Sequence, residues 1–180
     1  EALAARLPPE LSRAHFVNSG SEAVEGGLKL AYAATKRRGV LHCERSYHGV
    51  SLGALSVMGS TRMRAPFPEL PGTEMIPFGD LDAAKAKLET ERFAAFIVEP
   101  IQFEGGVRLC DPSWFAAVAE LCRKHGTALV FDEAQTGLGR TGTLFAFEWL
   151  GVVPDVLCYA KALSGGGSTL RNRPSVLACA

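Results

Sequence analysis

The sequence predicts an α/β protein with a mostly parallel sheet covered by helices on both faces. Strand-length apolar runs, such as residues 94–98 and 128–131, alternate along the chain with segments of helical spacing, such as 22–36 and 112–125. Strands that are buried on both faces read as continuous apolar runs, and parallel neighbours need crossover connections between them. In sheets of this kind ligands bind beyond the carboxyl ends of the strands.

Helix-capping signals set the bounds of the predicted elements. Asp111 and Pro112 form an N-cap followed by a proline in the first turn, and Gly126 ends the same helix. In chain order we expect a helix at 22–36, strands at 40–43 and 94–98, a helix at 112–125, and strands at 127–131 and 155–159. The polar residues just past the predicted strand ends are Glu99, Gln102, Glu104, Asp132, Gln135 and Lys161.

Composition narrows the function classes. The 180 residues carry 19 Lys and Arg against 19 Asp and Glu, and this neutral balance argues against nucleic-acid and polybasic membrane-surface binding. No apolar run approaches the ~20 residues that span a bilayer. Five scattered cysteines without a C-x-x-C pair match neither a disulfide framework nor a zinc site, so we expect a cytoplasmic location.

Several generic motifs fail on context. Residues 137–142 match G-x-G-x-x-G but lie too far past the strand that ends at Asp132, and no acidic ribose ligand follows the next strand. Residues 128–133 resemble the acidic strand of ATPases, but the chain contains no G-x-x-x-x-G-K-[ST]. Residues 49–53 match G-x-S-x-G without a strand to deliver Ser51, so a capping serine at a helix start is the better interpretation and a serine hydrolase the weaker one.

Four sites together point to a cofactor. Residues 18–23 place a glycine and two hydroxyls at a helix start, which suits an anion such as phosphate, although taken alone they favour an ordinary N-cap at Ser19 or Ser21. Tyr47 follows a strand, and by itself it is a core or interface aromatic. Asp132, with Gln135 three residues later, ends a buried strand, where a carboxylate needs a cationic partner.

Lys161 is the fourth site. It follows a strand among apolar neighbours, where burial lowers the pKa of a lysine and makes it a nucleophile; a surface lysine is the alternative. A phosphate cradle, an aromatic plate, a carboxylate and a nucleophilic lysine are the parts that hold pyridoxal 5'-phosphate.

These residues carry a family resemblance. In order, the blocks at 16–23, 46–49, 99–106, 131–142 and 160–166 resemble those of class III pyridoxal-phosphate-dependent aminotransferases, the group of the acetylornithine, ornithine, 4-aminobutyrate and putrescine enzymes. The resemblance covers about residues 1–166. It implies a large domain of fold type I, with a mostly parallel sheet covered by helices on both faces but incomplete in this chain.

The resemblance also implies roles for individual residues at the cofactor. Ser19, Gly20 and Ser21 would hold the phosphate, and Tyr47 would stack on the ring. Asp132 would pair with the protonated ring nitrogen, so that the ring accepts electrons from the substrate carbon.

Further roles concern the reaction itself. Gln135 would hydrogen-bond the 3-oxygen of the ring, and Lys161 would form the Schiff base and then move the proton as general base and acid. Glu104 matches a glutamate near the substrate, while Phe103 beside it stands where the family usually has a small residue.

The extent of the chain leads to further expectations. We expect residues 1–166 to be a partial cofactor-binding large domain and residues 167–180 to be a tail that diverges from the family. Because the chain starts at Glu1 rather than Met, we also expect it to be the central part of a longer enzyme. The expected activity is transfer of an amino group from an amine or ω-amino acid to a 2-oxo acid, by a homodimer if full length. The alternative is an inactive fragment that at best binds the cofactor or a full-length partner. The isolated chain is expected to be poorly soluble.

Overall fold

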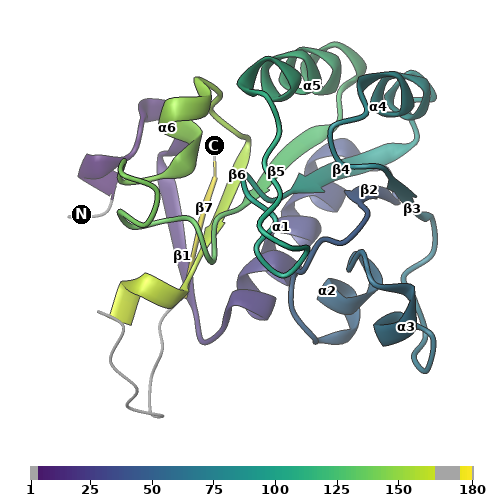
Figure 1. Cartoon of the computed structure of the whole chain (residues 1–180), viewed down its shortest axis with the longest axis horizontal. Helices are drawn as coiled ribbons and strands as arrows, with labels where there is room; N and C mark the ends of the chain where they lie inside the picture. Colours follow the sequence, from purple (N-terminus) through teal and green to yellow (C-terminus); the bar gives the residue numbers. More distant parts are fainter. Residues whose placement is uncertain (1–3, 165–174, 180) are drawn as a thin grey trace.

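The computed structural model describes residues 4–164 and 175–179 (Figure 1). Its strands are β1 (Arg13–Val17), β2 (Gly39–Cys43), β3 (Thr73–Ile76), β4 (Phe93–Val98), β5 (Ala128–Asp132), β6 (Val156–Tyr159) and β7 (Ser175–Cys179). Its helices are α1 (Gly20–Thr35), α2 (Leu52–Ser56), α3 (Thr61–Arg64), α4 (Leu81–Leu88), α5 (Pro112–His125) and α6 (Ala146–Leu150), with short 3-10 turns η1 (Ala4–Arg6), η2 (Pro9–Leu11) and η3 (Lys161–Ser164). Within these ranges no helix has the length and apolar character needed to cross a membrane.

The described strands form one sheet in the order β1-β7-β6-β5-β4-β2-β3. Neighbours from β3 to β6 pair in parallel, as predicted. β7 lies antiparallel between β6 and β1, so that Arg13 is opposite Cys179. The tail that we expected to diverge over 167–180 therefore contains one strand of the sheet, and its other residues, 167–174 and 180, lie outside the described ones.

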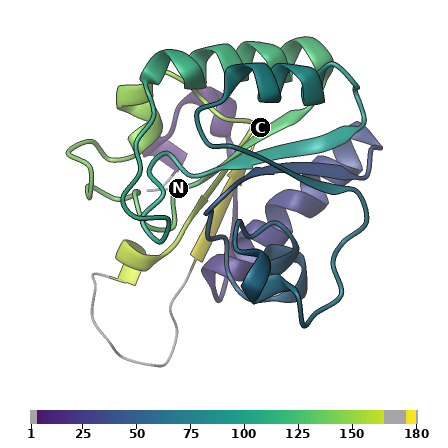
Figure 2. The ribbon, with the colours of Figure 1, turned by 45° about the vertical axis from the view of Figure 1, so that its right-hand side comes forward.

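Helices cover both faces of the sheet, which confirms the predicted layers. α4 and α5 lie on one face and α1 on the other (Figure 2). Side chains alternate accordingly along each strand: Phe96 and Phe131 pack under α5, whereas Ile97 and Val130 pack against α1. This period of two explains why the central strands read as fully apolar runs.

The caps of α5 are those that the sequence predicts, and at α1 Ser19 is the N-cap of the two serines that the sequence left open. At α1 the Ser19 hydroxyl accepts a hydrogen bond from the Glu22 backbone N–H at 3.1 Å. At α5 the Asp111 carboxylate accepts one from the Ser113 N–H at 2.9 Å, and Gly126 ends the helix with φ of 63°. Each cap satisfies backbone groups that would otherwise have no partner.

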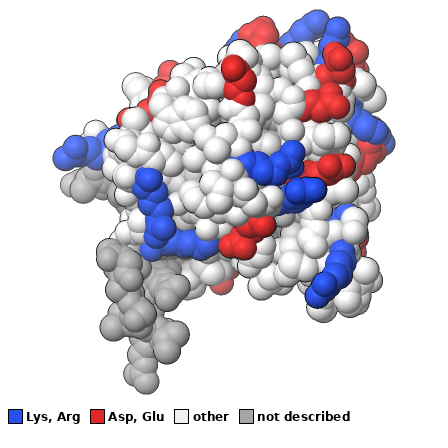
Figure 3. Space-filling model, in the orientation of Figure 1, with Lys and Arg blue, Asp and Glu red and all other residues white. Residues whose placement is uncertain are grey.

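The surface carries both signs of charge. Figure 3 shows lysine and arginine side chains beside aspartate and glutamate side chains on the face in view. One example is Glu74, which pairs with Lys87 at 2.8 Å and also with Arg92. These pairs hold β3 to α4 and to the start of β4, away from the carboxyl ends of the strands.

Candidate active site

A cavity of about 250 Å³ lies at the carboxyl ends of β4, β5 and β6. The N-terminus of α1 and the loop after β2 close its sides. Its lining residues are Asn18, Ser19, Gly20, Ser21, Tyr47, His48, Gly49, Glu99, Asp132, Ala134, Gln135, Ala160 and Lys161. Of the predicted site residues, Glu104 alone is not part of this lining.

The start of α1 forms one wall. The Ser19 carbonyl and hydroxyl are taken by the helix itself, accepting from Ala23 and Glu22 N–H groups. The Ser21 hydroxyl accepts a hydrogen bond from the Val50 N–H at 3.2 Å, which leaves its own hydrogen free to be donated. The positive end of the helix and this hydroxyl suit an anion.

Two glycines give this wall its shape. A Cβ on Gly20 would touch the Cβ atoms of Ala160 and Ala134 at 3.5 and 3.7 Å, so the helix start lies directly against the strand ends. Gly49 has φ of +114°, and a Cβ there would collide with Ser21 Oγ. A larger residue at Gly49 would displace the serine from the cavity.

The loop after β2 is held by two acidic residues at neighbouring strand ends. The Tyr47 backbone N–H donates to Glu99 Oε1 at 2.9 Å. The ring of His48 lies with Nδ1 2.8 Å from Asp132 Oδ2, and both side chains are buried. Sequence reasoning gave no role to Glu99 and His48; their positions, after a strand and beside Tyr47, were the available signal.

Asp132 occupies the floor of the cavity. Its Oδ1 accepts a hydrogen bond from the Ala134 N–H at 3.0 Å, in addition to the contact of Oδ2 with His48. The buried Glu99 differs: burial, and then the nearby Asp132 carboxylate, raise its pKa to about 9. The two acids of the cavity thus differ in their hydrogen-bond partners.

Gln135 and Lys161 complete the rim. Gln135 Nε2 is buried and has no hydrogen-bond partner among the described residues, so this donor is available to a ligand. Lys161 stands two residues after the end of β6, and its backbone N–H donates a hydrogen bond to the Ala134 carbonyl at 3.2 Å. The expectation that Lys161 is enclosed by apolar neighbours is wrong: its side chain is exposed, because it stands beyond the strand end at the open side.

Glu104 lies in the turn that follows β4. This turn is closed by a bridge between Gln102 and Arg108, and Glu104 is exposed on it. Phe103 beside it is half-buried. The turn is near enough for Glu104 to contribute to the raised pKa of Glu99, so it borders the site without lining the cavity.

The other candidate motifs lie elsewhere. Ser51 is the N-cap residue of α2, as expected, but its hydroxyl makes no capping hydrogen bond. Neither Ser51 nor His125, which ends α5 beside Glu91, lines the cavity. Residues 137–142 form turns between β5 and α6, and the described residues contain no cluster of three or more metal-ligating side chains.

Comparison with solved structures identifies the fold class. The chain is similar to an (S)-enantioselective omega-transaminase from Thermomicrobium roseum, with a TM-score of 0.90 and 30% identity over 99% of this chain and 45% of that one. It is also similar to the ornithine aminotransferase from Toxoplasma gondii, with a TM-score of 0.85 and 36% identity over 93% of this chain and 40% of that one. Pyridoxal phosphate partly occupies the active site of that Toxoplasma protein. The fold is therefore that of the transaminases of fold type I.

The family follows from the sequence itself. The family model for class-III aminotransferases matches residues 1–173, and the chain belongs to this family. It is 46% identical over 175 residues to Aminotransferase PigE of Serratia sp. (strain ATCC 39006), covering 94% of this chain and 20% of that protein. The chain thus spans a fifth of this relative and less than half of each solved chain above. Class III aminotransferases depend on pyridoxal phosphate.

Proposed function

We propose that this chain carries the cofactor site of a pyridoxal-phosphate-dependent aminotransferase, which transfers an amino group from an amine or ω-amino acid to a 2-oxo acid. The observation that carries the proposal is the single cavity lined by an acidic floor, an unpartnered amide donor, a helix start and a lysine. Family membership supports the same reaction class.

The residues present fit the cofactor's phosphate. The α1 start offers the backbone of Gly20 and Ser21, and the Ser21 hydroxyl still has its hydrogen to donate. Ser19 shapes this wall as the cap of α1. Phosphate at a helix start is favoured by the free N–H groups and by the helix dipole.

The residues also fit a pyridinium ring. Tyr47 lines the cavity beside Asp132 and supplies an aromatic face for stacking. The Asp132 carboxylate would hold the proton on the ring nitrogen, and the free Nε2 of Gln135 would donate to the 3-oxygen. When bound, the cofactor supplies an electron sink for the substrate's reacting carbon.

Lys161 performs the proton transfers in this proposal. Its exposed amine stands at the cavity rim, where it would bond covalently to the cofactor and give way to the substrate amine. The freed amine would then move a proton between the substrate carbon and a carbon of the cofactor, as general base and general acid. Glu104, exposed on the adjoining turn, would act near the substrate.

The remaining expectations stay part of the proposal. Residues 1–166 would form the cofactor-binding large domain of a longer enzyme that works as a homodimer. Val50 and Leu52, both exposed apolar residues next to the cavity, are consistent with coverage by a partner. A reducing, cytoplasmic location stays part of the proposal, on the five scattered cysteines without a C-x-x-C pair.

Borohydride labelling tests the proposal. We expect the chain, incubated with equimolar pyridoxal phosphate and then reduced, to carry the label on the Lys161 peptide in mass spectrometry. Lys161→Arg should abolish this label, whereas Lys124→Arg, which changes an exposed lysine of α5, should keep it. A folded chain labelled equally on its surface lysines would refute the proposal.

The inactive alternative rests on length, because the chain spans less than half of the solved transaminases that it resembles. It predicts specific labelling of Lys161 without turnover. Adding an amine and then a 2-oxo acid distinguishes the two: cyclic loss and return of the absorbance of lysine-bound cofactor shows an enzyme, and its absence in a labelled chain shows a binding fragment.

A further inference from the structure

Glu99 is a buried acid for which the proposed reaction provides no role. Glu99 comes directly after β4 and before Pro100, and it is 3% exposed. Among the described residues its side chain makes one hydrogen bond, accepted by Oε1 from the Tyr47 N–H at 2.9 Å. No basic side chain pairs with it in that part of the chain. A single neutral donor does not offset the free energy of burying a carboxylate.

Two carboxyl groups near Glu99 disfavour its ionised form, Asp132 from β5 and Glu104 from the turn after β4, whereas Lys161 from η3 favours it. The thiol of Cys43 from β2 is a further titratable group nearby. Burial is the largest cause of the raised pKa of Glu99, Asp132 is the next, and the exposed Lys161 opposes them least.

Asp132 has the partners that Glu99 lacks. Its two oxygens face separate groups, the Ala134 N–H at 3.0 Å and His48 Nδ1 at 2.8 Å. Of two neighbouring acids, the one with fewer partners for its negative charge is the one that more readily keeps a proton.

We propose that Glu99 is a positioning residue that retains its proton and fastens the main chain of Tyr47, so that Asp132 is the single carboxylate charge presented to the cofactor ring. This inference rests on the proposed function for the identity of the ring. The Glu99–Tyr47 hydrogen bond ties the ring's stacking partner to the end of a central strand. The neutral state of Glu99 matches one anion to one pyridinium cation.

The first test requires no cofactor. An infrared difference spectrum between the purified 180-residue chain and its Glu99→Gln variant near neutral pH should show loss of a protonated carboxyl band. Glu10→Gln, which removes an exposed acid of η2, should show loss of a carboxylate band. Loss of a carboxylate band in Glu99→Gln would overturn the inference. This result is independent of whether the chain binds pyridoxal phosphate, so it separates this inference from the proposed function.

The second test measures pyridoxal phosphate affinity by fluorescence titration. Glu99→Gln keeps both the acceptor oxygen and the neutral charge, so we expect affinity within about threefold of the parent. Glu99→Ala leaves the Tyr47 N–H without a partner, and we expect affinity about tenfold weaker or more. Thermal melts show whether each variant folds. If Glu99→Ala does not fold, the affinity of Glu99→Gln and the infrared spectrum test the inference. Equal weakening in two folded variants would contradict the assignment.

Discussion

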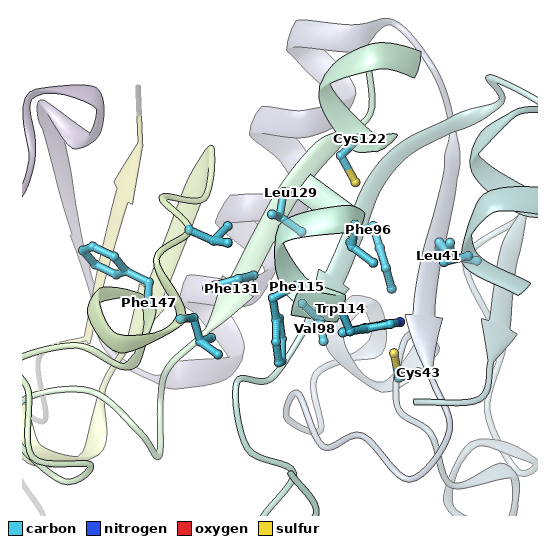
Figure 4. Packing of buried hydrophobic residues seen from close by; sticks show 14 of the residues in the cluster. Leu41, Cys43, Phe96, Val98, Trp114, Phe115, Cys122, Leu129, Phe131 and Phe147 are labelled. Atoms are coloured by element: carbon cyan, nitrogen blue, oxygen red, sulfur yellow. The ribbon is translucent and has the colours of Figure 1, made fainter. Parts of the chain in front are cut away.

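The two faces of the sheet are packed by different kinds of residue. Under α5 the cluster is aromatic: Trp114 and Phe115 meet edge to face with ring centroids 4.9 Å apart, and Phe115 meets Phe131 at 5.8 Å (Figure 4). Under α1 small residues dominate, including Ala23 in the helix and Ala95 in β4. Small residues let a helix lie close to a sheet, and this closeness brings the start of α1 to the strand ends.

Two successive residues, Asp132 and Glu133, show how the two faces of the sheet differ in what they do. Asp132 and Glu133 follow the alternation of β5, so they are directed to opposite faces. Asp132 meets His48 in the cavity, whereas Glu133 accepts hydrogen bonds from the N–H groups of Ala146 and Phe147 at 2.7 and 2.9 Å. The aromatic face therefore anchors α6, and the α1 face builds the site.

Breaking the aromatic face should give the largest loss of stability. Phe115→Ala removes a fully buried ring with aromatic neighbours, and we expect the free energy of unfolding to fall by about 3–5 kcal/mol. Urea denaturation measures this change. Leu109→Ala, at a residue 64% exposed, should change it by less than about 0.5 kcal/mol. Similar losses in the two variants would contradict the packing described.

The Glu133 anchor should make stability depend on pH. Burial raises the pKa of Glu133 from 4.5 to about 7, although the hydrogen bonds that its carboxylate accepts act to lower it. Because the folded state then binds more protons between these values, the free energy of unfolding should fall as pH rises from about 4.5 to about 7, by up to about 3 kcal/mol. Urea titrations across this range should show a shallower slope in Glu133→Gln. An unchanged slope would assign the pH dependence to other groups.

Overfilling the α1 face should affect both stability and the site. Ala23→Leu inserts a larger side chain where Ala23 is fully buried, at a cost of about 1–3 kcal/mol. If the close approach of α1 builds the cavity wall, pyridoxal phosphate affinity should fall as well. In folded Phe115→Ala that affinity should be retained. Loss of affinity in Phe115→Ala but not in Ala23→Leu would reverse the comparison.

The smallest effect is expected at the cap of α1. Ser19→Ala removes the hydroxyl that accepts from the Glu22 N–H, which costs about 1 kcal/mol of unfolding free energy. Ser19→Asp restores an acceptor but brings a negative charge to the proposed phosphate wall. We therefore expect Ser19→Asp to recover stability in thermal melts while binding pyridoxal phosphate more weakly than Ser19→Ala.

Local signals in the sequence were sufficient for the central buried strands and for the two long helices α1 and α5. The apolar runs of β4 and β5, the Ser19 cap and the Asp111-Pro112 start each depend on neighbouring residues, and the structure has them within two residues of the expected bounds. β1 and β7 were missed, because β1 exposes most of its side chains and each pairs with a strand from the other end of the chain.

Local signals likewise located some residues of the site but not the contacts between them. Tyr47, Asp132 and Lys161 could be placed around one cavity, because Asp132 ends a strand, the other two come within four residues of a strand end, and strand ends converge. Their roles at the cofactor remain predictions. The links from Glu99 to the Tyr47 main chain and from His48 to Asp132 depend on tertiary contacts across 52 and 84 residues, which no local pattern encodes.

The placement of β7 imposes an order of assembly. β1 precedes every other described strand along the chain, yet its only described strand partner is β7, and Arg13 lies opposite Cys179 in that pairing. On a ribosome β2, β4, β5 and β6 can associate while β1 still has an unpaired edge. β7 must then enter between β6 and β1, closing a loop of more than 150 residues, which is a slow kind of step. β1 can therefore join the sheet only after β7, more than 150 residues later in the chain, has been made.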